Sequence, residues 1–367
     1  MLTQRETWRH FDFWLLGAVA ILVIFGLAMI NSAIAGNEEL VALYPRQIIF
    51  ATVGFFVVLI AASIDYHLWP PVGQVLYFAV VLMLGVVSIA GDALGGARRW
   101  IDTGFFLIQP SELAKVVMIL ILADYFTRNK GKIHDLRWVL RSLLPTLGMV
   151  IWVFLQPDLS TSITIMVIWF ALLWASGLQL KHLMMFIGGG ILIAAIGFPF
   201  LETYQKERVL TFLFPSEEAR YGNSYNVNQA RITIGSGGWL GQGYGQGSQV
   251  QLRFLKVRHT DFIFSALSEE FGFVGAVTIL VLLVFVLYRC LRAARIARDT
   301  YGALICYGVA TFIFFHTAIN IAMNLNLIPV TGLPLPFISQ GGSSLLSTLL
   351  GIGIVESVVL RHKSLEF

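Results

Sequence analysis

Two ionisable residues, Glu112 and Lys115, stand three positions apart at the start of an apolar segment, in QPSELAK at 109–115. Pro110 followed by Ser111 is typical of the first turn of a helix, so the carboxylate and the ammonium lie on one helical face and can pair. Charges inside a membrane segment usually face the protein interior and mark a functional path. The pair therefore predicts a buried ionic site. The alternative is a structural ion pair that locks this segment to its neighbours.

A second carboxylate, Asp261, lies where a basic stretch meets an apolar one. Arg258 and His259 come directly before it, and an apolar run starts at Phe262. Desolvation raises the pKa of a carboxyl group, whereas neighbouring cations lower it. A carboxylate in such a position can act as a general base if it reaches a substrate hydroxyl. Asp261 is the strongest candidate for catalysis, and its alternative role is a carboxylate at a helix N-terminus.

Two further features are open to two interpretations each. Asp158, in QPDLSTS at 156–162, either caps the helix that follows it or belongs to the site. The glycine-rich run at 235–247 either lets backbone amides approach a phosphorylated or sugar ligand or builds turns. No strand–helix unit surrounds this run and no Gly-Lys-Ser/Thr loop occurs in the chain, so a nucleotide-binding fingerprint is excluded.

Polar residues also flank the last apolar segments. Glu269 and Glu270 either frame one cavity with Asp261 or mark a helix that does not enter the lipid until Phe271, and we prefer the second interpretation. The proline- and glycine-rich stretch 334–344 precedes the final segment. Irregular backbone at a membrane edge is tolerated where it is buried in protein or lines a cavity, so we expect a cavity-lining turn there.

Membrane-length apolar segments must position these residues. The 367 residues are 57% hydrophobic and only 13% charged, with a mean hydropathy of +0.77, whereas soluble domains average about 25% charged residues. A bilayer core of about 30 Å needs about 20 apolar residues per helix. The sequence predicts an all-α polytopic membrane protein, a single domain over 1–367, with ten spans at roughly 12–33, 47–64, 72–91, 111–127, 142–156, 160–176, 183–200, 265–288, 302–322 and 342–360.

The distribution of basic residues predicts the orientation. With the N-terminus in the cytoplasm, the inside loops hold fourteen Lys and Arg residues, whereas the short outside loops hold only Arg46, Arg98 and Arg99. Ten spans then place both termini in the cytoplasm. The longest interruption, 201–264, becomes an extracytoplasmic loop, and its aromatic, amide and charged residues favour an ordered loop over a linker.

Five stretches resemble, in order and over the whole chain, the SEDS family of membrane proteins (shape, elongation, division and sporulation). They are GARRWI at 96–101, QPSELAK at 109–115, QPDLSTS at 156–162, HTDFIFSALSEEFGFVG at 259–275 and PLPFISQGGSS at 334–344. QLRFLKVRHTDFIF is similar to the elongation branch, RodA-like, whereas GARRWI is spelled more as in the division branch, FtsW-like, which is the alternative. Ser160 and Gln340 depart from the family pattern, and neither departure removes an ionisable group.

The resemblance implies a peptidoglycan glycosyltransferase of the bacterial cytoplasmic membrane that polymerises lipid II at the outer face. The growing strand on undecaprenyl pyrophosphate is the donor, and the C4 hydroxyl of the N-acetylglucosamine on a fresh lipid II is the acceptor. The family works with a class B penicillin-binding protein, which supplies the transpeptidase, and nothing implies a nucleic-acid partner. A divalent cation, Mg²⁺ or Mn²⁺, could share the charge stabilisation.

The resemblance also assigns residues. The family's essential aspartate falls on Asp261 as general base on the acceptor hydroxyl, and its membrane Glu–Lys pair falls on Glu112 and Lys115. A pyrophosphate leaving group needs nearby cations. The candidate substrate-binding residues are therefore Lys115, Glu112, Arg98, Arg99, Arg208, Arg258, His259 and Asp158.

Two other functions stay open. Charges inside the membrane and broken helices also suit a lipid II flippase, although the sixth and seventh spans are nearly free of charge, whereas a flippase needs polar residues along the full depth. A non-catalytic scaffold of the wall-synthesis complex does not explain Asp261 or the Glu112–Lys115 pair.

The predicted orientation can be tested by labelling. A cysteine placed near Gly243, in the long loop, should react with a membrane-impermeant thiol reagent in intact cells, because this loop is outside. A cysteine near Gly131, in a basic loop, should react only after the cells are opened. Labelling of intact cells at the Gly131 site alone would invert the topology.

Overall fold

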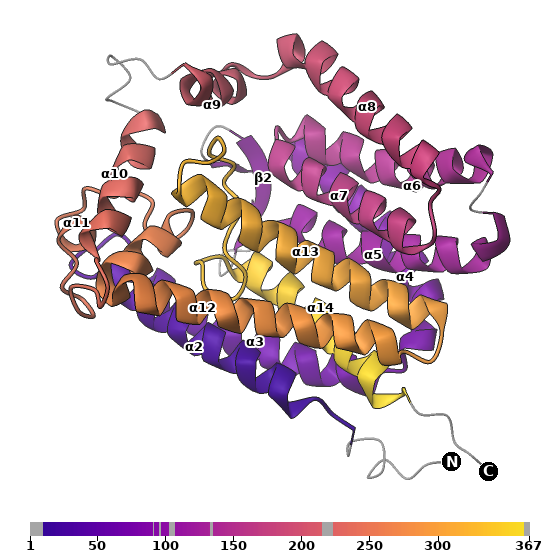
Figure 1. The fold of residues 1–367 in the computed structure, drawn as a ribbon, viewed down its shortest axis with the longest axis horizontal. Coiled ribbons are helices and arrows are strands. Elements are labelled where there is room, and N and C mark those ends of the chain that lie inside the picture. Colours follow the sequence, from indigo (N-terminus) through magenta and orange to yellow (C-terminus); the bar gives the residue numbers. More distant parts are fainter. Residues whose placement is uncertain are drawn as a thin grey trace.

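The computed structural model describes residues 10–90, 92–94, 97–102, 107–132, 135–214 and 223–362. Figure 1 shows a bundle of long helices with short helices gathered at one end. The bundle helices are α2 (Phe13–Ile34), α3 (Leu43–Ser63), α4 (Trp69–Ala90), α5 (Pro110–Arg128), α6 (Leu136–Leu155), α7 (Leu159–Ala175), α8 (Leu180–Gly197), α12 (Ile263–Ile296), α13 (Thr300–Asn324) and α14 (Gly342–Leu360). Each predicted span falls on one of them, which confirms the all-α polytopic membrane fold.

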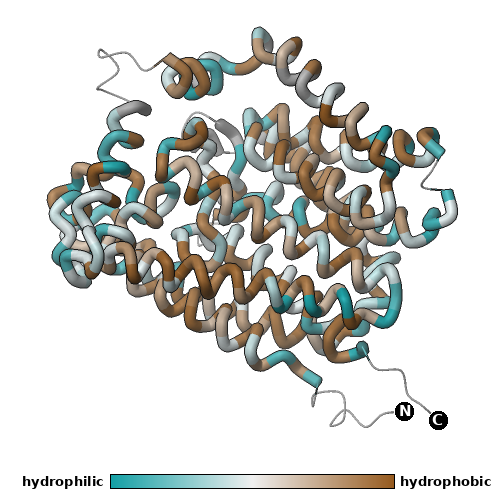
Figure 2. The backbone as a smooth tube through the Cα atoms, viewed as in Figure 1, coloured by the Kyte–Doolittle hydropathy of each residue, from teal (hydrophilic) through white to brown (hydrophobic). Residues whose placement is uncertain are grey.

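The bundle helices differ in the length of their apolar stretches and in how deeply they are buried. In the described part of the chain, eight helices are long and apolar enough to cross a membrane. The other two bundle helices are α7, which is apolar but has 17 residues, and α5, which carries the Glu112–Lys115 pair. Figure 2 shows apolar residues along the bundle and hydrophilic residues toward its ends. Helix α14 is the most buried of the eight and packs against α3, α5 and α13.

Local sequence signals set where helices begin. Pro110 occupies the first turn of α5, where its missing N–H is not needed. Asp158 caps α7 by accepting a hydrogen bond from the main-chain N–H of Thr161 (3.1 Å), as one of its two interpretations predicted. Asp299 caps α13 in the same way through Gly302 (2.9 Å).

The connection between α4 and α5 contains a small sheet that the sequence analysis did not predict. Strands β1 (Asp92–Leu94), β2 (Ala97–Asp102) and β3 (Leu107–Ile108) pair antiparallel in the order β1-β2-β3. The strands are too short to show a periodic pattern in the sequence. Three 3-10 turns lie elsewhere, η1 (Tyr66–Leu68), η2 (Lys130–Lys132) and η3 (Phe198–Phe200).

The predicted long loop is ordered where the structure describes it. Helices α9 (Thr203–Leu213), α10 (Asn223–Ser236) and α11 (Ser248–Gln251) lie between α8 and α12, and residues 215–222 are outside the described part. In Figure 1, α10 and α11 gather beside the start of α12, at one end of the bundle. The ordered loop that we predicted is therefore present in these parts.

Main-chain groups of the glycine-rich run pair with the backbone of α12 at the point where that helix is broken. Gly272 has φ 65° and ψ −164°, which interrupts the helix near its start. The run supplies the missing partners: Gln242 and Gly243 donate their N–H groups to the carbonyls of Glu269 and Glu270 (2.9 and 3.0 Å). A Cβ on Gly241 would collide with the Glu270 carbonyl, so glycine is required there for close approach. These glycines serve turns and packing.

Glu269 and Glu270 have a role that neither interpretation foresaw, because both side chains are fully buried. Glu269 accepts hydrogen bonds from the main-chain N–H groups of Gln249 (2.8 Å) and Val250 (3.1 Å), and Glu270 accepts one from Ser32. They hold the loop and α2 against α12.

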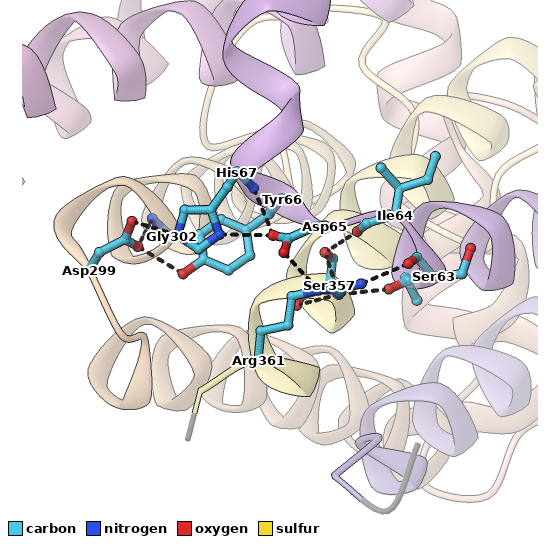
Figure 3. A network of polar contacts seen from close by, with 10 residues as sticks. Ser63, Ile64, Asp65, Tyr66, His67, Asp299, Gly302, Ser357 and Arg361 are labelled. Carbon is cyan, nitrogen blue, oxygen red and sulfur yellow. Dashed lines mark hydrogen bonds and ion pairs between the residues drawn. The ribbon is translucent and has the colours of Figure 1, made fainter. Parts of the chain in front are cut away.

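A polar network closes the opposite end of the bundle (Figure 3). Arg361, after α14, donates to the carbonyl of Ser63 (2.7 Å). Tyr66 donates to Asp299 (3.0 Å), and the Nε2 of His67 lies 3.3 Å from the same carboxylate. The α3–α4 turn, the start of α13 and the end of α14 are thereby joined.

Substituting Gly241 with alanine should destabilise the protein more than the same change at Gly245. Both glycines have positive φ, 82° and 68°, so both variants share the backbone strain, but only the Cβ of Gly241→Ala meets the Glu270 carbonyl. Overpacking of this kind costs roughly 1–3 kcal/mol. Thermal unfolding of the purified variants in detergent measures the difference. Equal losses of Tm would show that the loop does not pack on α12 in this way.

Candidate active site

Asp261 is held through its main chain. It lies in the turn directly before α12, and its carbonyl accepts hydrogen bonds from the side-chain amides of Asn320 and Asn324, each at 3.0 Å. Both asparagines are fully buried in α13. Asn324 is itself oriented by Ser265, whose hydroxyl donates to its Oδ1 (2.6 Å). The position of the Asp261 backbone is therefore fixed from two sides.

The Asp261 carboxylate itself is left available. It is partly buried, and none of the described residues donates a hydrogen bond to it. It faces Gly332, where a Cβ would lie 3.8 Å from Oδ2. Burial raises the pKa of the Asp261 carboxyl, and the charge of Arg208 opposes that shift. Arg208 comes from α9 and also donates to the carbonyl of Val330 (3.4 Å).

The segment Pro334–Ser344 joins the Asp261 turn to the start of α5. Ser339 donates its hydroxyl to the carbonyl of Thr260 (2.8 Å), and the N–H of Gln340 donates to the carbonyl of His259 (2.9 Å). At its other end, Ser343 accepts from the main-chain N–H of Gln109 (3.1 Å). Ser343 already lies in the first turn of α14, so the irregular stretch and the helix start that follows it together contact both regions that carry the charged candidates.

Glu112 and Lys115 form the ion pair that their spacing predicted. The Nζ of Lys115 lies 2.8 Å from Oε2 of Glu112, and Lys115 is fully buried. The same ammonium lies 3.3 Å from Nε2 of His316 and 4.8 Å from the ring centre of Phe312, both in α13. Ser347, in α14, donates to Oε2 of Glu112 (3.3 Å). Three helices meet at the pair.

Two other candidates meet at the α6–α7 turn. Asp158 accepts from the side-chain amide of Gln109 (3.2 Å) in addition to capping α7. Arg99, in β2, donates to the carbonyl of Gln156 (2.8 Å) and to the next carbonyl of the turn. These hydrogen bonds hold β2, which precedes α5 in the chain, against the α6–α7 turn. Arg98 lies in β2, and its side chain is outside the described part.

Arg258 and His259 contact main chain rather than the Asp261 carboxylate. Arg258 is buried and donates to the carbonyl of Ala33 at the end of α2 (2.5 Å). Burial lowers the pKa of His259 to about 4, and the charge of Arg258 adds to that shift, so the imidazole is neutral at physiological pH. Both residues therefore shape the turn that presents Asp261.

The sequence analysis missed three site residues on α13. His316, Asn320 and Asn324 are spaced at i, i+4 and i+8, so they lie on one helical face. This face touches Lys115 at one end and the Asp261 turn at the other. The available signal was the regular spacing of polar residues in an apolar span, which predicts a buried polar face.

An apolar groove of about 380 Å³ lies beside the ion pair. It runs between α3, α5 and α14, next to β3, and its lining includes Ile108, Leu113, Ser343 and Ser347. We expected a cavity-lining turn at 334–344. Ser343 is the residue of that stretch in the lining of this groove, and it contributes from the first turn of α14 rather than from the turn. Ser347 also bonds Glu112, so the groove ends next to the buried charges.

The described residues include no group of three or more His, Cys, Asp or Glu side chains that could hold a metal ion. Mg²⁺ is usually bound by one or two carboxylates together with waters and substrate phosphates, rather than by an all-protein cage. The Asp261 carboxylate is the group that would hold a divalent cation together with a bound pyrophosphate, and the proposed reaction is routed through the side chains of the chain itself.

Comparison with known proteins identifies the family. A family model for FtsW, RodA and SpoVE, described as "Cell cycle protein", matches residues 8–364. The chain belongs to this family. It is the SEDS family that the five motifs resemble, and the match extends over the described helices.

Relatives of known name align along almost the whole SEDS chain. Peptidoglycan glycosyltransferase MrdB of Escherichia coli (strain K12) is 34% identical over 366 residues, covering 97% of this chain and 95% of that protein. Stage V sporulation protein E of Bacillus subtilis is 34% identical, covering 95% and 96%. A probable peptidoglycan glycosyltransferase FtsW of Hydrogenovibrio crunogenus is 33% identical, covering 98% and 94%.

Solved structures agree with this assignment. A chain of a peptidoglycan synthase complex that coordinates polymerization and crosslinking superposes with a TM-score of 0.81 at 31% identity, covering 96% of this chain and 98% of that one. RodA of Thermus thermophilus superposes with a TM-score of 0.71 at 29% identity, covering 95% and 96%. The RodA structure and the MrdB relative support the elongation branch that the Arg258–Asp261 stretch predicted.

Proposed function

We propose that this chain is a peptidoglycan glycosyltransferase that polymerises lipid II into glycan strands for cell elongation and shape. Relatives that match it over nearly their whole length carry the glycosyltransferase activity in their names. The single observation that carries the proposed mechanism is the Asp261 carboxylate. Two buried asparagines donate hydrogen bonds to the main-chain carbonyl of Asp261, while no described residue donates one to its carboxylate oxygens.

In the proposed reaction, Asp261 is the general base. Its carboxylate takes the proton from the C4 hydroxyl of N-acetylglucosamine on an incoming lipid II, and that oxygen attacks the anomeric carbon of the growing strand. The bond from this carbon to the pyrophosphate breaks, and undecaprenyl pyrophosphate leaves with the electron pair. Burial raises the pKa of Asp261, which makes its ionised form a stronger base.

The leaving pyrophosphate develops negative charge that cations must stabilise. Arg208 already acts electrostatically on Asp261, so its charge reaches the reacting atoms. We assign the Glu112–Lys115 pair to the lipid-linked end of the donor, because Ser347 both lines the apolar groove and bonds Glu112. The groove then takes part of the isoprenoid chain. We also propose Arg98 and Arg99, both in β2, as further cations for the pyrophosphate.

The protein is a multi-pass membrane protein, and we propose that both termini are in the cytoplasm of the bacterial cell. Asp12, at the start of α2, donates its main-chain N–H to Glu356, near the end of α14 (3.0 Å), so these helix ends lie on one side. The Asp261 turn contacts the stretch before α14, at the opposite end of that helix, and we propose that this end is at the outer face. A class B penicillin-binding protein is the proposed partner, in line with the synthase complex that superposes on this chain.

Asp261→Asn should abolish polymerisation while the protein stays folded and bound to its partner. The amide keeps the shape of the side chain but cannot accept the hydroxyl proton as a base. The measurement is a gel assay of purified protein and partner with lipid II. Asp124→Asn is the matched control, since Asp124 pairs with the exposed Arg128 on the far part of α5, and its activity should stay near wild type.

Near wild-type polymer from Asp261→Asn would refute the base assignment. Absence of polymer from the wild-type complex, with lipid II transport intact, would favour a flippase. Absence of both activities would favour a scaffold.

The Glu112–Lys115 pair should be needed for activity as well as for the fold. Removing one partner leaves an unpaired buried charge, which costs roughly 3–5 kcal/mol, so Glu112→Gln and Lys115→Met should each lower the Tm. The double variant should recover much of the Tm because no charge is left unpaired, yet it should make no glycan. Thermal unfolding and the gel assay measure both. An active double variant would limit the pair to a structural role.

A further inference from the structure

His316 lies between two parts of the proposed site that no sequence motif connects. It is buried in α13, and its Nε2 is 3.3 Å from the Nζ of Lys115. Its imidazole also lies near the main-chain carbonyl of Pro334, where the irregular stretch before α14 begins. The ring of Phe312 packs edge-on against it, with ring centres 4.7 Å apart. The proposed mechanism has so far given His316 no role.

The contact with Lys115 determines which imidazole nitrogen carries hydrogen. A lysine ammonium only donates, so Nε2 must accept. His316 is therefore neutral, with its hydrogen on Nδ1, because a second hydrogen on Nε2 would point at the ammonium. Nε2 is the acceptor for Lys115, and Nδ1–H is the donor left on the other side of the ring.

These contacts place the ammonium in relation to Asp261. Glu112 and His316 accept from Lys115, and they come from different helices, α5 and α13. One turn further along α13, Asn320 donates both to the carbonyl of Leu333 (2.8 Å) and to that of Asp261 (3.0 Å). A single rigid helical face thus contacts the lysine, the segment at 333–334 and the aspartate turn.

We propose that His316 is a positioning residue of the glycosyltransferase site, which sets the Lys115 ammonium at a fixed place relative to Asp261. The inference rests on the proposed function and deepens it. A misplaced catalytic group can cost about 100-fold in rate. Loss of the acceptor should therefore lower kcat, while KM for lipid II should change much less, since His316 does not touch the substrate.

Three substitutions separate the two contacts. In His316→Gln, the amide oxygen can reach the place of Nε2 and keep the acceptor for Lys115, while the donor on the Pro334 side is lost. In His316→Asn, the amide nitrogen takes the place of Nδ1 and keeps the donor, while the acceptor for Lys115 is lost. His316→Phe removes both and keeps the ring.

We expect kcat for lipid II polymerisation to fall at least about tenfold in His316→Phe and His316→Asn. His316→Gln should recover most of the wild-type kcat, even if its Tm is the lower of the two amide variants. His182→Gln is the matched control, because His182 is another buried histidine in a bundle helix, α8, and its kcat should be unchanged. Steady-state kinetics with the partner present and thermal unfolding in detergent supply the readouts.

The outcomes are distinct. If His316→Asn is as active as His316→Gln or more so, or if kcat follows Tm across the variants, His316 only supports the fold and the inference is wrong. The Gln and Asn comparison stands even if His316→Phe does not fold. A wild-type complex that makes no polymer would instead refute the proposed function, before any His316 variant is measured.

Discussion

An ammonium group inside a membrane protein needs acceptors supplied by the protein, because lipid and apolar side chains cannot solvate it. Lys115 is fully buried, and its acceptors are Glu112 in its own helix and His316 in α13, with the face of Phe312 beside them. Glu112 is in turn bonded by Ser347 of α14. Helices α5, α13 and α14 are thus fixed around one charge, and the apolar groove ends at that point.

The same requirement applies to irregular backbone at membrane depth, where unpaired carbonyls and N–H groups are costly. Around the site, side chains supply the hydrogen bonds that this irregular backbone needs. Asn320 and Asn324 donate to the carbonyl of Asp261, and Ser339 donates to that of Thr260. The turn is therefore held firmly while the Asp261 carboxylate receives no hydrogen bond from the described residues. That contrast between an anchored backbone and a free carboxylate suits a general base.

Sequence reasoning located eight of the ten spans because apolar length decides them, and α5 and α7 because their apolar runs continue on either side of charged or capping residues. It paired Glu112 with Lys115 because helical spacing places them on one face. The cap at Asp158 was also readable from local residues. The roles of Glu269, Asn320 and His316 were not, because they depend on partners in other elements, such as the N–H groups of 249 and 250 or the ammonium of Lys115. The sheet at 92–108 escaped because its strands are too short for a pattern.

The two ends of the bundle differ in how they are joined. At the end shown in Figure 3, Arg361 and Asp299 bind the α3–α4 turn to the start of α13 and the end of α14. At the other end, the same helices meet the irregular segment and the groove. Helix α14 is therefore held by polar contacts near both ends, by Arg361 at one and by the bond from Ser347 to Glu112 at the other. The groove beside it is lined mostly by apolar side chains, so a lipid chain can slide along the helix without breaking any of these polar contacts.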